Sequence, residues 1–361
     1  MSTEKNTVEE KIGALRELYR RRGYARFRMR QFEAYDFYAR NKNFLVSENI
    51  ITFTDLDGKL MALKPDVTLS IIKNSDAGEI LRAYYHENVY RPTKNGTFGE
   101  IMQMGLECIG DLDAYCVFEV LSLAAESLDT LSPDWLLDIS DLWFFPAAIE
   151  RAGADGETGD KLFACLGEKN AHELKAVCSA AGVCEKETDK LLSLLTFNGE
   201  ARKALNVLDS LYDDDAWKER VAAFGAVLSA LPGERVRVDF SVVNNRKYYN
   251  GLVFQGFING VPQSVLSGGQ YDNLLARMGK TGRAVGFALY LDRLEEYFMP
   301  RDAYDADVVL LYDAKTPPQK VADAAAELGK NGDAVTALPA LPQKLKARRV
   351  VKLDENGVMT C

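Results

Sequence analysis

Apolar positions near the N-terminus recur at the spacing of one helical face, which predicts a helix that begins after Thr7 and ends before Gly23. Thr7 and Glu10 have the spacing of a capping box, in which side chains bond the free backbone N–H groups of the first turn. Residues 27–42 mix aromatic and charged side chains without a clear period, so the pattern assigns no element there. The helical stripe consists of Val8, Ile12, Leu15 and Leu18.

Beyond residue 50 the pattern changes to short runs separated by turn residues, which is typical of strands. Residues 51–65 predict two strands around an Asp-Gly turn. Residues 79–92 and 97–110 predict a longer antiparallel pair joined by Thr-Lys-Asn-Gly. A helix is expected from about Ala114 to Leu131, followed by a strand near residues 135–142.

The middle of the chain, residues 145–230, has helix-length apolar periods and no strand pattern. Alternation returns at residues 236–242. Further strands are expected at residues 252–257 and 262–269, and helices at 272–278 and in the tail of 285–298. An antiparallel sheet interrupted by a helical block is an α+β architecture.

After Pro300 the pattern predicts a small α/β unit, with strands near residues 306–313, 334–338 and 348–353 and a helix over 316–332. Such a unit is near the lower size limit for a self-standing core. The expected domains are residues 1–302, with a helical insertion at about 145–230, and residues 303–361.

The composition is that of an ordinary globular protein, with 47% apolar and 27% charged residues. No run approaches the roughly 20 apolar residues of a membrane span, and the acidic, polar start is unlike a secretory signal. The six cysteines lack a CxxC spacing and are expected to be reduced and buried. Together these features predict a cytoplasmic protein without a membrane partner.

Charge and histidine content count against several classes of site. The formal net charge of −9 argues against a nucleic-acid binder, because phosphate contacts need a basic footprint. His86 and His172 lie far apart in sequence, which leaves little for a histidine-based metal site or a serine–histidine triad. His86 could be catalytic, although a lone histidine in an aromatic strand is more often structural. No metal or cofactor is expected.

One predicted strand carries a polar row. Gln103, Gly105 and Glu107 should point to one face, because side chains alternate along a strand. An amide, a gap and a carboxylate could form the floor of a small polar site, with Gly105 making room for the ligand. The alternative is a solvated face with a glycine bulge.

Two further polar positions lie beside predicted strand ends. Asp66 and Thr68 follow Pro65, where they could bind an ammonium group or cap the next helix. Arg91 precedes a turn and offers a planar donor fork for a carboxylate or phosphate, although most surface arginines bind neither.

The segment Asn-Asn-Arg-Lys-Tyr-Tyr-Asn-Gly at residues 244–251 could be an ordinary strand connection or a ligand site. Downstream, Gly268 and Gly269 allow close backbone approach, and Asp272 begins a helix. Arg293 is expected on a helix that begins close after Gly286. These glycines do not form a Walker or Rossmann pattern.

In this order, the stretches resemble the catalytic domain of histidyl-tRNA synthetase, a class II synthetase. The resemblance runs from about residue 10 to 300 and implies an antiparallel sheet flanked by helices, with a helical insertion. It rests on residues 63–68 (LKPDVT), 89–92 with 103–110 (VYRP and QMGLECIG), 248–254 (YYNGLVF), 267–275 (SGGQYDNLL) and 285–294 (VGFALYLDRL).

The resemblance implies a pocket for free L-histidine. Glu107 and Tyr249 would hold the imidazole, and Asp66, Thr68 and Gln103 would bind the amino end. Arg91 matches a motif 2 arginine that contacts the α-phosphate in the synthetase. The residues expected to bind histidine are Asp66, Thr68, Arg91, Gln103, Glu107, Tyr248 and Tyr249.

The nucleotide side of the site departs from the synthetase pattern. Asn244 stands where the family has an arginine that stabilises the adenylation transition state, and losing such a group commonly costs about 10²–10³ in rate. Arg246, two residues away, could substitute for it. Arg293 matches the motif 3 arginine that packs on ATP. Asn244, Arg246 and Arg293 are therefore expected to form a vestigial nucleotide site.

Other positions depart from the synthetase pattern as well. The motif 2 loop is shortened, with Thr97 and Gly99 where arginines would align. Tyr290 replaces a glycine, and its ring could crowd the adenine pocket. Arg30 falls where motif 1 has a proline. The C-terminal unit resembles only the beginning of an anticodon-binding domain.

The chain departs from the synthetase at the ATP and tRNA positions but keeps the histidine pocket. In this it resembles a paralogous family, the regulatory subunits of ATP phosphoribosyltransferase. The resemblance implies a non-catalytic protein that forms a self-dimer, binds a short catalytic subunit and senses histidine, without tRNA. Two alternatives remain open: a divergent histidyl-tRNA synthetase that uses Arg246, and a structural subunit with a vestigial pocket.

Overall fold

The computed structural model describes residues 8–42, 45, 49–75, 79–93, 96–229, 231, 233–243, 248–298, 304–354 and 357–360. The chain divides into two compact units, one spanning Asn6–Tyr297 and one built on Phe298–Cys361. The polar stretches singled out above all belong to the larger unit.

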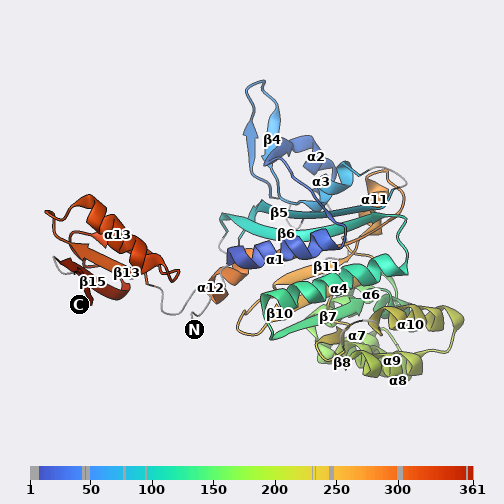
Figure 1. Ribbon diagram of the computed structural model, residues 1–361. Coiled ribbons are helices and arrows are strands. Elements are labelled where there is room, and N and C mark those ends of the chain that lie inside the picture. Colours follow the sequence, from blue (N-terminus) through green and yellow to red (C-terminus); the bar gives the residue numbers. More distant parts are fainter. Residues whose placement is uncertain are drawn as a thin grey trace. The chain divides into compact units, whose positions relative to one another are not determined.

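The described residues of the larger unit form a nine-stranded sheet with the order β1-β5-β6-β12-β11-β10-β7-β9-β8 (Figure 1). Its longest pair, β5 and β6, is the predicted antiparallel pair, in register from Leu81 opposite Ile109 to Pro92 opposite Phe98. Two pairs, β1 with β5 and β7 with β9, are parallel, so the sheet is mixed and not purely antiparallel. The strands are β1 (Ala25–Arg26), β5 (Leu81–Pro92), β6 (Phe98–Gly110), β7 (Trp135–Asp141), β8 (Asn198–Glu200), β9 (Val236–Asp239), β10 (Leu252–Ile258), β11 (Leu266–Gln270) and β12 (Arg283–Tyr290).

Two long helices, α1 (Val8–Arg21) and α4 (Ala114–Leu131), lie along one face of this sheet (Figure 1). Both were predicted from their apolar periods. Gly23 turns the chain after α1 with a φ of 82°, a conformation that glycine adopts without strain. Asp113 caps α4 by accepting a hydrogen bond from a first-turn amide. Thr7, the predicted cap of α1, lies outside the described residues.

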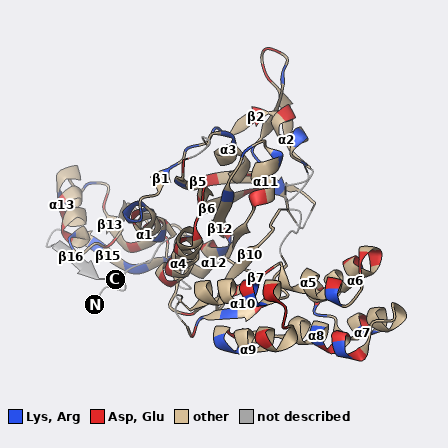
Figure 2. Cartoon of the chain, turned by 90° about the vertical axis from the view of Figure 1, so that its right-hand side faces the viewer, with Lys and Arg blue, Asp and Glu red and all other residues tan. Residues whose placement is uncertain are grey.

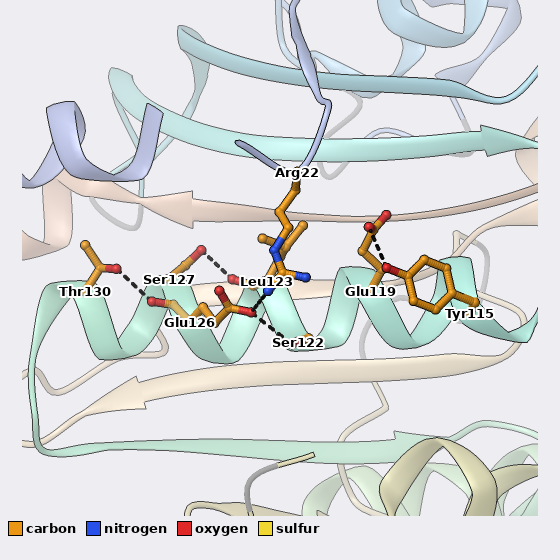
Figure 3. A network of polar contacts seen from close by, with 8 residues as sticks. All are labelled: Arg22, Tyr115, Glu119, Ser122, Leu123, Glu126, Ser127 and Thr130. Atoms are coloured by element: carbon orange, nitrogen blue, oxygen red, sulfur yellow. Dashed lines mark hydrogen bonds and ion pairs between the residues drawn. The ribbon is translucent and has the colours of Figure 1, made fainter. Parts of the chain in front are cut away.

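Polar contacts along α4 hold α1 and the segment after it in place (Figure 3). Arg22 forms an ion pair with Glu126 at 2.7 Å, and the Ser122 hydroxyl donates to the same carboxylate at 3.0 Å. On α1 itself, the Tyr19 hydroxyl lies 2.9 Å from that of Ser127. α4 also packs on β6, β7, β10 and β12, so the two helices cover one face of the sheet as a layer.

A second, three-stranded antiparallel sheet contains β2 (Phe32–Ala34), β3 (Thr52–Thr54) and β4 (Leu60–Leu63), in the order β2-β4-β3. The predicted Asp-Gly turn joins β3 to β4, with Gly58 at a φ of 84°. Just after β4, the fully buried Lys64 forms an ion pair with Glu87 of β5, which ties the small sheet to the large one. The nearby helices are α2 (Tyr35–Arg40) and α3 (Thr68–Lys73).

The insertion between β7 and β9 is mostly helical, as predicted, and has an aromatic core. The Trp217 ring lies 5.2 Å from that of Phe144 and 4.6 Å from that of Tyr212. Basic and acidic residues are interspersed along the insertion helices (Figure 2). The helices are α5 (Phe144–Arg151), α6 (Gly156–Glu168), α7 (Ala171–Ala180), α8 (Glu185–Thr196), α9 (Ala201–Leu211) and α10 (Asp215–Leu228).

The prediction that the insertion has no strand was wrong. β8 lies inside it and pairs with β9, because the Asn198 amide donates to the Asp239 carboxylate at 2.7 Å and holds the segment against the sheet edge. The alternation at residues 236–242 also predicted a longer strand than β9. This strand ends at Asp239, whose carboxylate accepts from the Ser241 amide at 2.9 Å and turns the chain.

Arg293 was expected on a helix that begins close after Gly286, and this was also wrong. β12 continues to Tyr290, because β6 and β11 pair with it on both sides. Arg293 lies in the following 3-10 turn, Leu291–Leu294, which precedes α12 (Glu295–Phe298). The helix α11 (Asp272–Arg277) starts at Asp272 as predicted.

The smaller unit has a four-stranded sheet with the order β14-β13-β15-β16. β13 is parallel to both β14 and β15, and an apolar cluster around Val308, Leu310, Val351 and Leu353 packs with one helix. The predicted α/β unit is present, with the additional strand β16. Its elements are β13 (Ala306–Tyr312), α13 (Pro318–Gly329), β14 (Val335–Leu338), β15 (Ala347–Asp354) and β16 (Gly357–Thr360).

The cysteine prediction holds for four described residues and fails for one. Cys108, Cys116, Cys165 and Cys178 are buried free thiols, whereas Cys184 is exposed and Cys361 lies outside the described residues. None of the described helices has the length and apolar character to cross a bilayer.

We expect Lys64→Met to destabilise the larger unit by about 3–5 kcal/mol, because it leaves the Glu87 carboxylate largely buried without its cation. Urea unfolding would measure the change. Lys73→Met is the matched control, since Lys73 is 44% exposed in its 2.8 Å pair with Glu33 and such pairs contribute about 0–1 kcal/mol. Equal losses in the two variants would contradict the prediction.

Candidate ligand-binding site

A cavity of about 280 Å³ lies on the sheet face that α1 and α4 leave uncovered. Tyr84 packs against Tyr19 of α1, so Tyr85, the next residue of the same strand, points to the opposite face and lines the cavity. The lining residues are Asp66, Thr68, Tyr85, Arg91, Gln103, Glu107, Tyr248, Tyr249, Gln255, Ser264, Ser267, Tyr271, Gly286, Phe287, Ala288, Tyr290 and Arg293.

The seven residues named from the sequence for histidine binding all line this cavity, and Arg293 lines it too. Strand alternation explains part of the clustering, since Gln103 and Glu107 of β6 face the same side. The segment between β4 and α3 brings in two more residues, and the segment before β10 brings in the tyrosine pair. Asn244 and Arg246 lie outside the described residues.

Glu107 is the more buried of the two carboxyl groups that line the cavity, with 2% of its surface exposed against 8% for Asp66. One carboxyl oxygen accepts a hydrogen bond from the Thr68 hydroxyl at 2.7 Å, and the other accepts one from the Tyr271 hydroxyl. Burial raises the pKa of Glu107 to about 8, and the nearby Asp66 adds to the rise, while the two hydrogen bonds oppose it. Glu107 is therefore largely protonated at neutral pH in the empty cavity.

Glycine on the neighbouring strand makes the position of Glu107 possible. Gly286 of β12 lies opposite Glu107 of β6, and a Cβ there would lie 1.8 Å from a carboxyl oxygen. Any other residue at position 286 would displace the carboxyl.

Asp66 and Arg91 form a pair at another part of the cavity. One Asp66 oxygen accepts from the Leu69 amide at 3.0 Å and the other from Arg91 at 3.3 Å. Arg91 also donates to the Pro65 carbonyl at 2.6 Å. Asp66 thus bonds the backbone at the start of α3 and also faces the cavity, where its binding of an ammonium group stays a prediction. Arg91 is engaged by protein groups and holds Asp66 in place.

Three tyrosine rings form one wall. The Tyr248 ring lies 4.7 Å from that of Tyr249 and 5.5 Å from that of Tyr271. Gly269 lies directly under Tyr249, since a Cβ there would be 2.7 Å from the ring, which explains the close backbone approach expected at this glycine. Burial raises the pKa values of all three phenols, so their hydroxyls stay protonated and can donate.

The interpretation of Gly105 as room for a ligand was wrong. A Cβ at Gly105 would lie 2.2 Å from the Phe287 carbonyl and 2.6 Å from the Tyr85 hydroxyl oxygen. The space is therefore taken by Tyr85, which lies across the strand from Gly105. The glycine lets this phenol join the cavity wall.

Sequence reasoning missed Tyr85 and Tyr271 as site residues. Tyr271 had a usable signal, because it directly follows the Gly-Gly segment and precedes the helix start at Asp272. Tyr85 had none of its own, since an aromatic residue in an aromatic strand reads as core.

Arg293 closes another part of the lining. Its guanidinium lies 4.0 Å from the Tyr290 ring centroid, in cation–π geometry, and it donates a hydrogen bond to the Ser264 carbonyl. The cation that the sequence assigned to a nucleotide site is thus bonded within the chain. Tyr290 lies opposite Gln103 in the sheet register.

Gln103 has unused hydrogen-bonding capacity. It is 3% exposed, and its side-chain nitrogen has no hydrogen-bond partner among the described residues. A buried amide donor without a partner is unfavourable, so a ligand acceptor near Gln103 would be stabilising.

The arrangement suits a small polar molecule that carries N–H groups and an aromatic ring. Asp66 can accept from an N–H group, the Glu107 carboxyl group can form a hydrogen bond with a ring nitrogen, Gln103 can donate, and the tyrosine wall can pack on a ring. Among the described residues, no cluster of three His, Cys, Asp or Glu side chains could hold a metal ion. The cavity is built for binding by hydrogen bonds.

Known proteins match most of this chain. The family model for histidyl-tRNA synthetase matches residues 2–294. An ATP phosphoribosyltransferase regulatory subunit from Clostridium kluyveri is 32% identical over 303 residues, which cover 77% of this chain and 74% of that protein.

Solved structures show the same fold. A crystal structure described as an ATP phosphoribosyltransferase regulatory subunit/histidyl-tRNA synthetase from Bacillus halodurans has a TM-score of 0.75 at 24% identity, covering 95% of this chain and 92% of that one. A chain of an ATP phosphoribosyl transferase complex from Thermotoga maritima has a TM-score of 0.62 at 16% identity, covering 79% and 97%. The predicted class II synthetase-like α+β fold is confirmed.

We expect Glu107→Gln to stabilise the empty protein increasingly as the pH rises from 5 to 8. The folded-state pKa of Glu107 is raised to about 8, so the native state binds the extra proton and this group makes stability fall as the pH rises toward that value. In the glutamine variant the free energy of unfolding lacks this decrease with pH, which is at most about 1.4 kcal/mol per pH unit for one proton. Urea unfolding at several pH values would test this, and a constant difference would contradict it.

Proposed function

The chain belongs to the family of ATP phosphoribosyltransferase regulatory subunits, which share the class II fold of histidyl-tRNA synthetase, and on this premise we propose that it is a non-catalytic subunit that activates a short catalytic partner and senses histidine. The reaction served is the first step of histidine biosynthesis, in the cytoplasm. Free L-histidine is the inhibitory ligand.

The observation that carries the proposal is a contrast within one cavity, between the carboxyl group of Glu107, which is available to a ligand, and the guanidinium of Arg293, which is bonded within the chain. Thr68 and Tyr271 hold the Glu107 carboxyl group in place for a hydrogen bond with a ligand nitrogen. Arg293 instead stacks on Tyr290 and bonds the Ser264 carbonyl. A guanidinium engaged in this way does not present its fork to a phosphate, which supports amino-acid binding without adenylation.

Each proposed contact follows from the chemistry of its group. Glu107 and Tyr249 hold the imidazole, with Tyr248 packed beside them. Asp66 binds the α-ammonium group, and Arg91 keeps that carboxylate aligned. Thr68 and Gln103 complete the amino end, and Asn244, Arg246 and Arg293 are the remains of a nucleotide site.

The proposed partners are a short catalytic subunit and a second copy of this chain. Support for the catalytic partner comes from the Thermotoga maritima structure, which is described as an ATP phosphoribosyl transferase complex. The proposed domains are residues 1–302, synthetase-like, and residues 303–361, a truncated anticodon-binding-like unit. Neither tRNA nor a membrane is a proposed partner.

A divergent histidyl-tRNA synthetase is the second candidate. It is favoured by the family model that matches residues 2–294 and by the double description of the Bacillus halodurans structure. Arg246 would then supply the missing transition-state cation.

We expect a short-form ATP phosphoribosyltransferase catalytic subunit to become active only when this chain is added, and L-histidine to inhibit the complex. Glu107→Ala should weaken histidine binding about 10–100-fold and Tyr249→Phe about 2–10-fold, because each loses a hydrogen-bonding group that lines the cavity. Assembly should persist in both variants. Turnover by the complex and calorimetry with histidine would measure these effects.

Tyr115→Phe is the matched control, since Tyr115 is 54% exposed on α4 and outside the cavity. A catalytic subunit that neither co-elutes with this chain nor responds to it would overturn the proposal. Activation without any heat from millimolar histidine would instead identify a structural subunit with a vestigial pocket.

We expect no histidine-dependent exchange of pyrophosphate into ATP by the purified chain, because Arg293 is engaged within the chain and Asn244 is neutral. Exchange at a rate that Arg246→Ala abolishes would establish the synthetase alternative.

A further inference from the structure

Among the described residues, no cation pairs with the buried carboxyl group of Glu107. Its two oxygens accept from Thr68 and Tyr271, which are neutral hydroxyls, and none of the described lysines, arginines or histidines forms an ion pair with it. The guanidinium groups in the cavity lining belong to Arg91 and Arg293. Arg91 is bound to Asp66 and Arg293 to the Ser264 carbonyl, so neither neutralises Glu107.

The other groups around Glu107 make an isolated anion there more unfavourable. Burial of the carboxyl group is the main contribution, and Asp66, from the segment before α3, adds a like charge. The titratable groups that share the cavity with Glu107 come from β5, β12 and the segments beside α3, β10, β11 and the 3-10 turn. They are Asp66, Tyr85, Arg91, Tyr248, Tyr249, Tyr271, Tyr290 and Arg293.

We propose that Glu107 enters the complex as a neutral carboxylic acid and shares its single proton with an unprotonated nitrogen of the ligand's heteroaromatic ring. This inference rests on the proposed function, in which the ligand is free histidine. The proton either stays on the carboxyl oxygen or moves to the ring nitrogen. Protein and ligand together therefore neither gain nor lose a proton when both start neutral at these positions.

The shared proton makes Glu107 a specificity-determining residue. A ring nitrogen with a pKa near about 6.5, as in imidazole, is neutral at pH 7 and can accept the proton. An amino acid with a permanent cation, such as arginine, can bind only after Glu107 releases its proton. A ring of the same shape without an acceptor nitrogen leaves the buried O–H without a partner.

The pH dependence of affinity follows from counting protons. Below about pH 6.5 the free imidazole is protonated and must lose a proton, so affinity falls about tenfold per pH unit. Above about pH 8 the empty pocket is ionised, since the pKa of Glu107 is raised to about 8, and the complex must take up a proton. Affinity is highest between these limits.

Tyr271 acts as a positioning residue for this proton. Its hydroxyl donates to Glu107 and stabilises the anionic form relative to the neutral one. Tyr271→Phe removes that donor, so it should move the alkaline loss of affinity to higher pH. A purely structural role would lower affinity equally at all pH values.

The test is calorimetry of the full chain with L-histidine at about pH 5.5, 7.2 and 9.0, in buffers with different heats of ionisation. We expect release of about one proton at the low pH, no exchange at the middle pH and uptake at the high pH. The uptake at the high pH is about one proton for Glu107 plus the fraction that the ligand's own α-amino group has lost, and Glu107→Gln shows the second part alone. Uptake of a proton at pH 7.2, with affinity rising as pH falls, would mean an ionised Glu107 that binds imidazolium and would overturn the inference alone. Absence of binding at every pH would instead overturn the proposed function.

Three variants and one analogue sharpen the test. Glu107→Gln should bind more weakly and keep only the alkaline loss of affinity that comes from deprotonation of the ligand's α-amino group, because an amide does not ionise. Tyr271→Phe should move the alkaline loss that is due to Glu107 to higher pH. Glu126→Gln, on α4 away from the cavity, is the matched control. Its affinity for histidine should fall at both low and high pH, as in the unmodified chain. Triazolylalanine has a ring that stays neutral at low pH. Its affinity for the unmodified chain should therefore not fall at low pH, while the loss at high pH should remain. An unchanged profile with this analogue would contradict proton sharing without relying on any variant.

Discussion

The buried carboxyl of Glu107 is the constraint around which the larger unit is organised. Its surroundings come from four separate parts of the chain: β6 carries it, the start of α3 and the residue after β11 each donate a hydroxyl, and a glycine of β12 leaves room for it. A carboxyl with 2% exposure is unfavourable unless such groups surround it. The order of strands that brings these parts together is thus also what makes the site possible.

The positive groups of the cavity are held by the chain itself. Arg91 bonds Asp66 and the Pro65 carbonyl, and Arg293 bonds the Ser264 carbonyl and stacks on Tyr290. Catalysis of phosphoryl or adenylyl transfer needs cations aimed at developing charge. Because both guanidinium groups already have partners within the chain, the cavity is better suited to binding a small amino acid than to such catalysis. This agrees with the regulatory role proposed for the chain.

The site also lies where the two sheets of the larger unit meet. Lys64 and Glu87 join β4 to β5, and Asp66 follows two residues later at the start of α3. A ligand that bonds both Asp66 and Glu107 would therefore hold the small sheet against the large one. Regulation requires that the ligand bind one state of a complex more tightly than another, and this joint is a place where two states can differ in contacts.

The sequence by itself determined most of the elements and eight of the seventeen residues that line the cavity. Local periods are set by backbone geometry, so the long β5–β6 hairpin, α4 and the α/β unit after residue 303 followed from the pattern of apolar positions. Alternation along β6 placed Gln103 and Glu107 on one side, and the family motifs supplied Asp66, Thr68 and Tyr249.

Tertiary structure decided what local patterns do not encode. β8 exists because Asp239 holds Asn198 at the sheet edge, and β12 reaches Tyr290 because strands pair with it on both sides. The occupant of the space at Gly105, the partners of Arg293 and the raised pKa of Glu107 likewise depend on residues distant in sequence. Burial and close contact are properties of the assembled fold, so side-chain order alone does not reveal them.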